Sequence, residues 1–101
     1  MITHLVLFRF KPGFAAESPA VKAVHVAMNA LPGHVTGIRE WRHGFNVTPD
    51  AEAWDYGLFA SFDDEQALFS YFEHPAHLAV LAQWNEVAEL RFVDLAPPKF
   101  E

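Results

Sequence analysis

The alternation of apolar and polar residues predicts four β-strands. The first, residues 2–11 (ITHLVLFRFK), has mostly apolar side chains on both of its faces and is ended by Pro12-Gly13. A strand that meets water on one side alternates between apolar and polar residues, so this strand is expected to be covered on both sides. Three further segments have the loose alternation or the β-branched and aromatic content of strands: residues 34–46, 56–62 (YGLFASF) and 90–96 (LRFVDLA).

Two regions between these strands have the spacing of amphipathic helices. In the first, Ser18-Pro19 has the form of an N-cap followed by proline at the first helical position, and Pro32-Gly33 ends the segment. Its apolar residues recur every three or four positions: Val21, Val24, Met28 and Leu31. The second region follows the candidate N-cap pair Asp63-Asp64 and is interrupted by Pro75. Because proline lacks the amide hydrogen of a continuous helix, we expect a bent helix or two abutting helices here.

The resulting order, β-α-β-β-α-β, predicts an α+β fold of the ferredoxin-like type, with a four-stranded antiparallel sheet and both helical connections on one face. The length of 101 residues suits a single domain over residues 1–101. The opposite sheet face would carry apolar side chains, either Leu5 and Leu7 or Val6 and Phe8. An uncovered apolar sheet promotes aggregation, so the expected cover is the sheet of a second identical chain related by a two-fold axis. The expected partner is therefore the protein itself, as a homodimer.

The amino-acid composition excludes several classes of function. The chain has no cysteine, which excludes disulfides, thiolate catalysis and cysteine-ligated metals. Its formal net charge is −6, from 7 basic and 13 acidic residues, and the basic residues form no cluster, so no nucleic-acid partner is expected. The first residues, MITHLVLFRFK, have neither the form of a secretory signal nor the length of a membrane span. We therefore expect a cytoplasmic location and no membrane partner.

Several segments resemble the stress-responsive A/B barrel (Dabb) family of dimeric α+β barrels. They lie in the family's order between His4 and Asp94: HLVLFRFK, LPGHVTGIREWRHGFN, YGLFASF, YFEHPAHL and RFVDL. The most specific combination is the opening HLVLF with the motif Tyr-x-x-His-Pro-x-His, which here runs from Tyr71 to His77. The resemblance implies a dimeric ferredoxin-like barrel. It implies less about activity, because the family includes plant stress-induced proteins, bacterial proteins of unknown role and olivetolic acid cyclase, which closes a linear polyketide thioester by aldol chemistry.

The candidate catalytic pair is His77 and Tyr71. His77 would fall in the first turn of the helix that Pro75 opens, where free amides and the helix dipole disfavour imidazolium, so the ring is expected to stay neutral. A neutral imidazole can act as a general base, and a tyrosine hydroxyl can polarise a carbonyl or hold an enolate oxygen. The resemblance to olivetolic acid cyclase, gap-free over the motif, implies these two roles.

Four further residues are candidates for binding a substrate. The same resemblance places His4 in a cavity and makes Asp94 a residue that could orient a histidine. Phe8 and Trp84 are expected to line this pocket between the sheet and the helices. The cyclase has a histidine in its third strand where this chain reads Tyr56-Gly57-Leu58, so the glycine is expected to remove a polar group from the pocket.

Each candidate also has a structural interpretation. Tyr71 could be a core aromatic residue with its hydroxyl at the rim, and His77 could bond to Asp94 or to the backbone. His74 is expected to end a helix. The other three histidines are interpreted as surface or edge residues: His25, His34 and His43. His74 and His77 have a spacing that a metal could use on one helical face, but no third ligand is evident and no metal site is expected.

Three functions remain open. The first is a cofactor-free enzyme, such as a cyclase, isomerase or lyase, that transfers a proton next to a carbonyl of a small apolar or polyketide-like ligand. The second is a non-catalytic stress-response or small-molecule-binding protein. The third is the haem or aromatic monooxygenase activity of other dimeric α+β barrels, for which the sequence contains no supporting motif.

Overall fold

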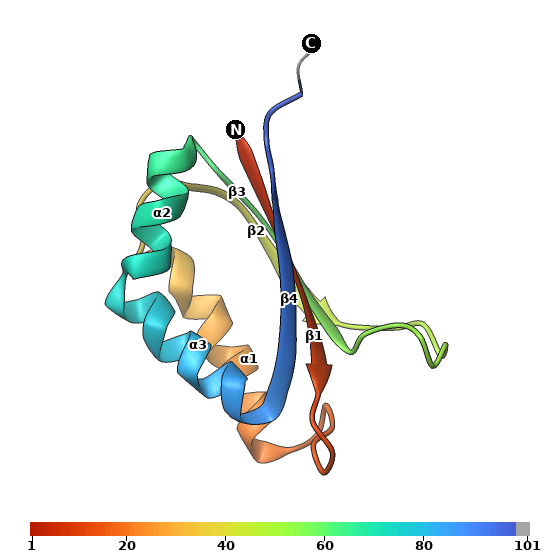
Figure 1. The fold of residues 1–101 in the computed structure, drawn as a ribbon. Coiled ribbons are helices and arrows are strands. Elements are labelled where there is room, and N and C mark those ends of the chain that lie inside the picture. Colours follow the sequence, from red (N-terminus) through yellow and green to blue (C-terminus); the bar gives the residue numbers. More distant parts are fainter. Residues whose placement is uncertain (99–101) are drawn as a thin grey trace.

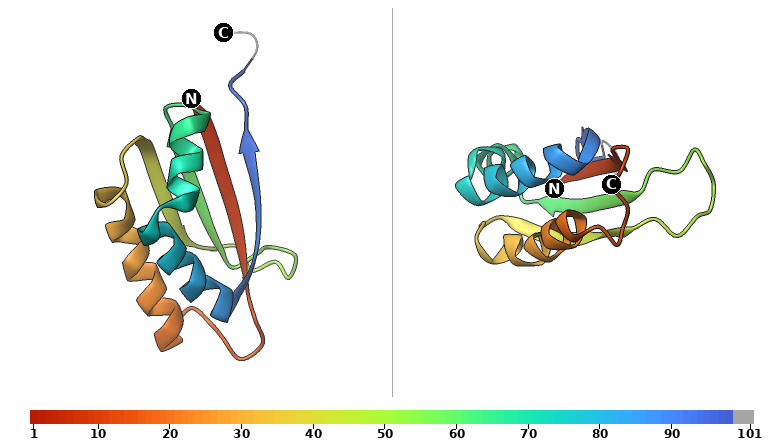
Figure 2. Two further views of the ribbon diagram at one scale, coloured as in Figure 1. Left: turned by 60° about the vertical axis from the view of Figure 1, so that its left-hand side comes forward. Right: turned by 90° about the horizontal axis from the view of Figure 1, so that it is seen from below.

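The computed structural model describes residues 1–98 and confirms the predicted order of elements. The elements are β1 Ile2–Phe10, α1 Pro19–Ala30, the 3₁₀ turn η1 Leu31–Gly33, β2 Ile38–Phe45, β3 Tyr56–Phe62, α2 Glu65–Glu73, α3 Pro75–Val87 and β4 Ala88–Leu95. The strands form one antiparallel sheet in the order β2-β3-β1-β4. Figures 1 and 2 show all helices on one face of the sheet and the opposite face uncovered, which is the ferredoxin-like arrangement. Within residues 1–98, none of the helices combines the length and apolar character that a membrane span requires.

β1 contributes to the core on one face and to an open apolar surface on the other. Val6 and Phe8 are buried under the helices, whereas Leu7 between them is 52% exposed. Apolar residues of the uncovered face occupy neighbouring register positions on three strands: Leu5, Leu7, Phe59 and Val93. The face that lacks a cover is therefore the one with Leu5 and Leu7.

α1 forms where the apolar spacing predicts it. Val21, Val24 and Met28 are buried, and Pro19 starts the helix. Ser18 occupies the N-cap position, but its hydroxyl makes no capping bond. Ser18 Oγ instead accepts the backbone N–H of Ala15 at 2.8 Å, which orders the turn before the helix.

Two strand boundaries differ from the prediction by more than one residue. β4 begins at Ala88, directly after α3, and β2 begins only at Ile38, because residues 34–37 form a turn. Gly37 in that turn has a φ of +90°, a conformation that favours glycine. A Cβ at this position would also lie 2.9 Å from the Cβ of Ala67 on α2. Both constraints require glycine where the chain enters β2 beside α2.

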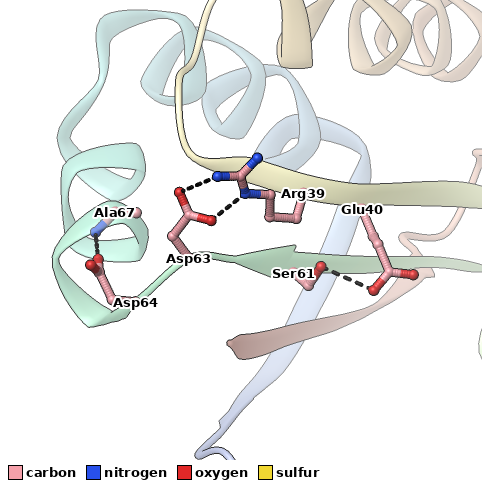
Figure 3. Close-up of polar contacts among 6 residues, drawn as sticks. All are labelled: Arg39, Glu40, Ser61, Asp63, Asp64 and Ala67. Atoms are coloured by element: carbon pink, nitrogen blue, oxygen red, sulfur yellow. Dashed lines mark hydrogen bonds and ion pairs between the residues drawn. The ribbon is translucent and has the colours of Figure 1, made fainter.

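The corner between β3 and α2 is held by polar contacts that Figure 3 shows. The Asp64 carboxylate accepts the backbone N–H of Ala67 at 2.8 Å, so Asp64 is the N-cap of α2. Arg39 of β2 donates from two guanidinium nitrogens to the two carboxylate oxygens of Asp63. Because both partners of this ion pair are exposed, water screens their attraction. The Asp64 cap therefore stabilises the corner more than the ion pair does.

α2 and α3 are two abutting helices that meet at His74. α2 ends at Glu73, and Pro75 is the first residue of α3. The backbone N–H of His74 donates to the carbonyl of Tyr71 at 3.1 Å, and His74 Nδ1 accepts the backbone N–H of Ala76 at 3.0 Å. His74 therefore ends one helix and caps the next, which agrees with its structural interpretation.

Gly37→Ala is expected to lower the free energy of unfolding by roughly 1–3 kcal/mol, because the new Cβ sits at positive φ and is pressed against Ala67. Urea denaturation measures the change. Gly33→Ala is the matched control, since a Cβ at Gly33 meets nothing within 4 Å. Equal losses in the two variants would contradict this account of the turn.

Candidate functional site

A pocket of about 260 Å³ lies between the helices and the β1–β4 side of the sheet. Two histidines line it, His4 from β1 and His77 from α3. The remaining lining residues are apolar: Val6, Phe72, Leu81, Leu90 and Phe92. A space of this size and lining suits a small apolar ligand with few polar groups.

His4 is held by Asp94 of the neighbouring strand. The two residues are partners in the β1–β4 register, and His4 Nδ1 lies 2.5 Å from Asp94 Oδ1. A carboxylate accepts hydrogen bonds, so Nδ1 carries a proton, and the lone pair of the neutral ring is on Nε2. His4 is 4% exposed, whereas Asp94 is only partly buried and does not line the pocket. The structure thus places Asp94 where it orients His4.

His77 is oriented by the break that precedes α3. In a continuous helix the carbonyl of Phe72 would accept the N–H of Ala76, which here donates to His74 instead. His77 Nδ1 donates to this carbonyl at 3.0 Å. A carbonyl can only accept, so Nδ1 carries the proton and the neutral ring has its lone pair on Nε2. The sequence left Asp94 and the backbone as possible hydrogen-bond partners of His77, and the structure shows the backbone.

The surroundings of His77 favour its neutral form. Burial lowers the pKa of His77 below its ordinary value of 6.5, and the positive charges that His4 and His74 can carry lower it further. The hydrogen bond to Phe72 acts in the opposite direction and is outweighed. The sequence predicts a neutral His77 from the helix dipole, but the larger cause in the structure is desolvation.

Tyr71 packs beside His77, with 4.3 Å between the ring centroids. The residue is 2% exposed, and burial raises the pKa of its hydroxyl above the ordinary value of 10.0. The hydroxyl therefore stays protonated and can donate a hydrogen bond. Tyr71 also lies near His4, with 6.0 Å between these two ring centroids.

A smaller inner hollow of about 40 Å³ adjoins the pocket. The two spaces have these lining residues in common: His4, Val6, His77, Leu81 and Leu90. Phe8, Tyr71 and Trp84 line the inner hollow and not the outer pocket. All the sequence-based candidates except Asp94 therefore surround adjoining spaces. Leu90 and Phe92 were missed, although they alternate with Asp94 along the last strand and so share its face.

Gly57 lies on the other face of the sheet, contrary to expectation. Its register partners are Leu7 and Gly44, and it lines the hollow of the uncovered face. Leu58 is the neighbour that is buried under the helices and lines the inner hollow. The expectation that Gly57 removes a polar group from the pocket is therefore wrong.

Residues 2–94 match the family described as the Stress responsive A/B Barrel Domain, Dabb. The chain belongs to the Dabb family. An uncharacterized protein of Streptomyces coelicolor is 40% identical to this Dabb protein over 88 residues, which are 87% of this chain and 91% of the other. A dimeric ferredoxin-like protein of unknown function from Thermobifida fusca is 26% identical and superposes with a TM-score of 0.84, over 95% of this chain and 90% of that chain.

Hydroxynitrile lyase from Passiflora edulis also has this fold. It superposes on the Dabb chain with a TM-score of 0.82 over 99% of this chain and 95% of that chain, at 13% identity. At this identity the likeness concerns the fold alone. The family and the ferredoxin-like fold predicted from the sequence are both confirmed.

A second polar cluster in this Dabb protein joins α1 to the sheet. His25 Nδ1 lies 2.8 Å from the hydroxyl of Tyr56, His43 Nδ1 bonds the same hydroxyl, and His43 Nε2 lies 2.9 Å from Asn29 Oδ1. Burial lowers the pKa of His43 and raises that of Tyr56, so both are neutral near pH 7. The interpretation as surface or edge residues holds for the exposed His34 and for His43, which lies on the edge strand β2, but it misses that His25 and His43 bond a buried tyrosine.

Histidines do not gather into a metal site in the described part of this Dabb chain. Within residues 1–98, no three His, Cys, Asp or Glu side chains lie close enough together to hold an ion.

The stability of this Dabb protein is expected to fall at acidic pH partly through His77. The pKa of His77 in the folded chain lies below its ordinary value of 6.5, so folding favours the neutral ring. The stability that His77 contributes in this way is fully present above pH 6.5. It is lost progressively as the pH falls from 6.5 through the folded pKa. His77→Gln should therefore flatten the decline in melting temperature between about pH 7.5 and pH 5.

Thermal melts of His34→Gln over the same pH range are the control, because His34 is exposed. A His77→Gln curve as steep as that of the wild type would show that this histidine does not carry the pH dependence.

Proposed function

We propose that this Dabb protein transfers a proton next to the carbonyl of a small apolar ligand, without a cofactor. His77 would be the general base and Tyr71 the hydrogen-bond donor to the carbonyl oxygen. The observation that carries the proposal is the state of His77, a neutral ring whose Nδ1 is tied to the backbone and whose Nε2 is left with a lone pair at the pocket.

In the proposed step, His77 Nε2 takes the hydrogen of the carbon next to the carbonyl as a proton, and the electron pair of that C–H bond becomes part of an enolate. The Tyr71 hydroxyl donates to the oxygen on which the negative charge develops. The enolate carbon then takes one of two courses. It takes the proton back from the imidazolium, or it attacks a second carbonyl carbon of the substrate, whose oxygen receives the electron pair of the broken C=O π bond and then the proton of the imidazolium, which restores neutral His77. His4 Nε2 is proposed to accept a hydrogen bond from a hydroxyl or enol group of the substrate, with Asp94 as the positioning residue of His4.

The pocket lining indicates the chemical class of the ligand. The lining contains apolar residues and histidines but no lysine or arginine within residues 1–98. A phosphate or carboxylate would be buried there without a counter-charge, which is costly. The preferred ligands are therefore neutral ketones and thioesters with an apolar chain, a class that includes polyketide-like compounds. Phe8 and Trp84 would contact the inner end of such a ligand.

The likeness to hydroxynitrile lyase from Passiflora edulis agrees with this class of chemistry only at the level of the fold. A shared backbone can host a lyase reaction without assigning a catalytic residue, so the proposal rests on His77 and Tyr71 of this chain.

Hydrogen–deuterium exchange tests the proton transfer directly. In D₂O, the wild-type protein is expected to accelerate the loss of the proton NMR signals next to the carbonyl of nonan-2-one. His77→Ala should reduce the enzymatic exchange rate by roughly 10²–10⁴-fold, the usual contribution of a general base. Tyr71→Phe should reduce it by roughly 10²–10³-fold, the usual contribution of one donor to a developing oxyanion.

His34→Ala is the control variant and should exchange as fast as the wild type, since His34 is exposed and lies outside the pocket. Circular dichroism establishes that each variant is folded. Exchange that is equally fast with wild type and His77→Ala would refute the catalytic proposal. Binding of the ketone without exchange would favour a small-molecule-binding protein instead.

We also propose that the uncovered sheet face binds a second copy of the chain, which completes a dimeric α+β barrel. This face has a hollow of about 660 Å³, far larger than the pocket on the helix side. Leu5, Leu7 and Phe59 line it, and Arg42 and Arg91 stand at its margins. The dimeric state of the Thermobifida fusca relative supports a second copy as the cover.

Leu7→Glu is expected to convert the dimer into a monomer, because it would bury a carboxylate in the apolar centre of the interface. Light scattering of the purified protein measures the mass. Val26→Glu is the matched control: Val26 is 65% exposed on α1, in the helix layer, and the substitution should leave the dimer intact. An unchanged dimer mass for Leu7→Glu would place the interface elsewhere.

A further inference from the structure

Trp84 of α3 has a buried polar group that the proposed reaction does not use. The residue is 2% exposed, and its ring packs on Phe8 and Tyr56, with centroid distances of 4.2 and 4.7 Å. Within residues 1–98, its indole N–H has no hydrogen-bond partner. Buried tryptophan N–H groups are normally paired. Trp41 follows this rule, because its N–H donates to the carbonyl of Met28 at 3.0 Å.

The inner hollow is the space in which a partner for this N–H would lie. Trp84 lines it together with His77 and Tyr71, and it adjoins the outer pocket. Trp84 follows His77 by seven residues, two turns of helix, so the two side chains lie on nearly the same face of α3 and about 10 Å apart along its axis. A ligand chain that starts beside His77 can therefore extend toward Trp84.

We infer that Trp84 determines specificity by donating its indole N–H to a second, neutral acceptor oxygen of the ligand. The inference rests on the proposed function, because it takes the reacting carbonyl to lie beside His77. The inner hollow has no lysine or arginine in its lining, so a carboxylate there would lack a counter-charge. A ketone, ester or thioester oxygen satisfies the donor without adding charge. The ligand class becomes an apolar chain with two separated carbonyl groups.

Nonane-2,8-dione and nonan-2-one form a matched pair of probes, because they have the same chain and differ by one carbonyl. Titrations of ¹⁵N-labelled wild-type protein are followed through the tryptophan indole NMR signals, and Trp84→Phe identifies the signal of Trp84. The dione is expected to move the Trp84 indole proton downfield, whereas nonan-2-one should not. A net hydrogen bond corresponds to an affinity gain of roughly 2–12-fold, so the dione should bind more tightly by that factor.

Two variants test whether the affinity difference between the two ketones arises from the N–H of Trp84. Trp84→Phe keeps an aromatic ring on Phe8 and Tyr56 but removes the N–H, and it should abolish the affinity difference between the two ketones. Trp41→Phe is the control: Trp41 lines neither the pocket nor the inner hollow, and its N–H already donates to the carbonyl of Met28, so this variant should leave the difference in place. If Trp84→Phe does not fold, Trp41→Phe and Trp54→Phe assign the Trp84 signal by elimination, because the chain has three tryptophans, and the indole shift of the wild-type protein then decides the question.

Equal affinity for both ketones with an unmoved Trp84 signal would overturn the inference, and so would failure of both ketones to bind. A hollow of about 40 Å³ also accommodates one water molecule. A persistent magnetisation transfer from water to the Trp84 indole in the presence of dione would therefore count against it too. Exchange of nonan-2-one without a Trp84 response would leave the proposed function standing and remove only this inference. A Trp84 response to the dione without exchange would support the hydrogen bond from Trp84 and remove the proposed proton transfer.

Discussion

The candidate site depends on one constraint, the proline that separates α2 from α3. Pro75 cannot donate an N–H to the preceding helix, and the nearby donors are diverted: the N–H of His74 goes to Tyr71, and the N–H of Ala76 goes to His74 Nδ1. The carbonyl of Phe72 is then available to accept from the ring of His77. A backbone irregularity thereby determines which nitrogen of the imidazole holds the proton. The Tyr-x-x-His-Pro-x-His motif is thus explained by hydrogen bonding as well as by residue chemistry.

Burial and pairing together give the pocket its electrostatic character. Both histidines have Nδ1 engaged by an oxygen, His4 by a carboxylate and His77 by a carbonyl, so the partners differ in charge although the tautomer is the same. The proposed function accordingly assigns the two imidazoles different roles, His4 in binding a substrate hydroxyl and His77 in accepting a proton.

Local patterns predicted most of the fold and part of the site. The apolar residues on both faces of the first strand indicated an uncovered sheet face, and Pro75 indicated the helix break, because both signals lie in short stretches of chain. The polar cluster of His25, His43 and Tyr56 was missed because its members come from α1, β2 and β3, and only the packing brings them together. The face of Gly57 was also missed, since a strand that is apolar on both sides gives no indication of which residues point toward the helices.

The alternation along β1 separates two demands that one strand has to meet. His4, Val6 and Phe8 line the pocket and the inner hollow, while Leu5 and Leu7 lie on the face proposed to bind the second copy. A step of one residue therefore separates the proposed ligand contacts from the proposed contacts with the second copy. Paralogues of this chain could diverge in the compounds they accept while their subunit pairing is conserved, or exchange pairing partners while keeping their chemistry. Substitutions of the two kinds would occur at alternate positions of a single strand.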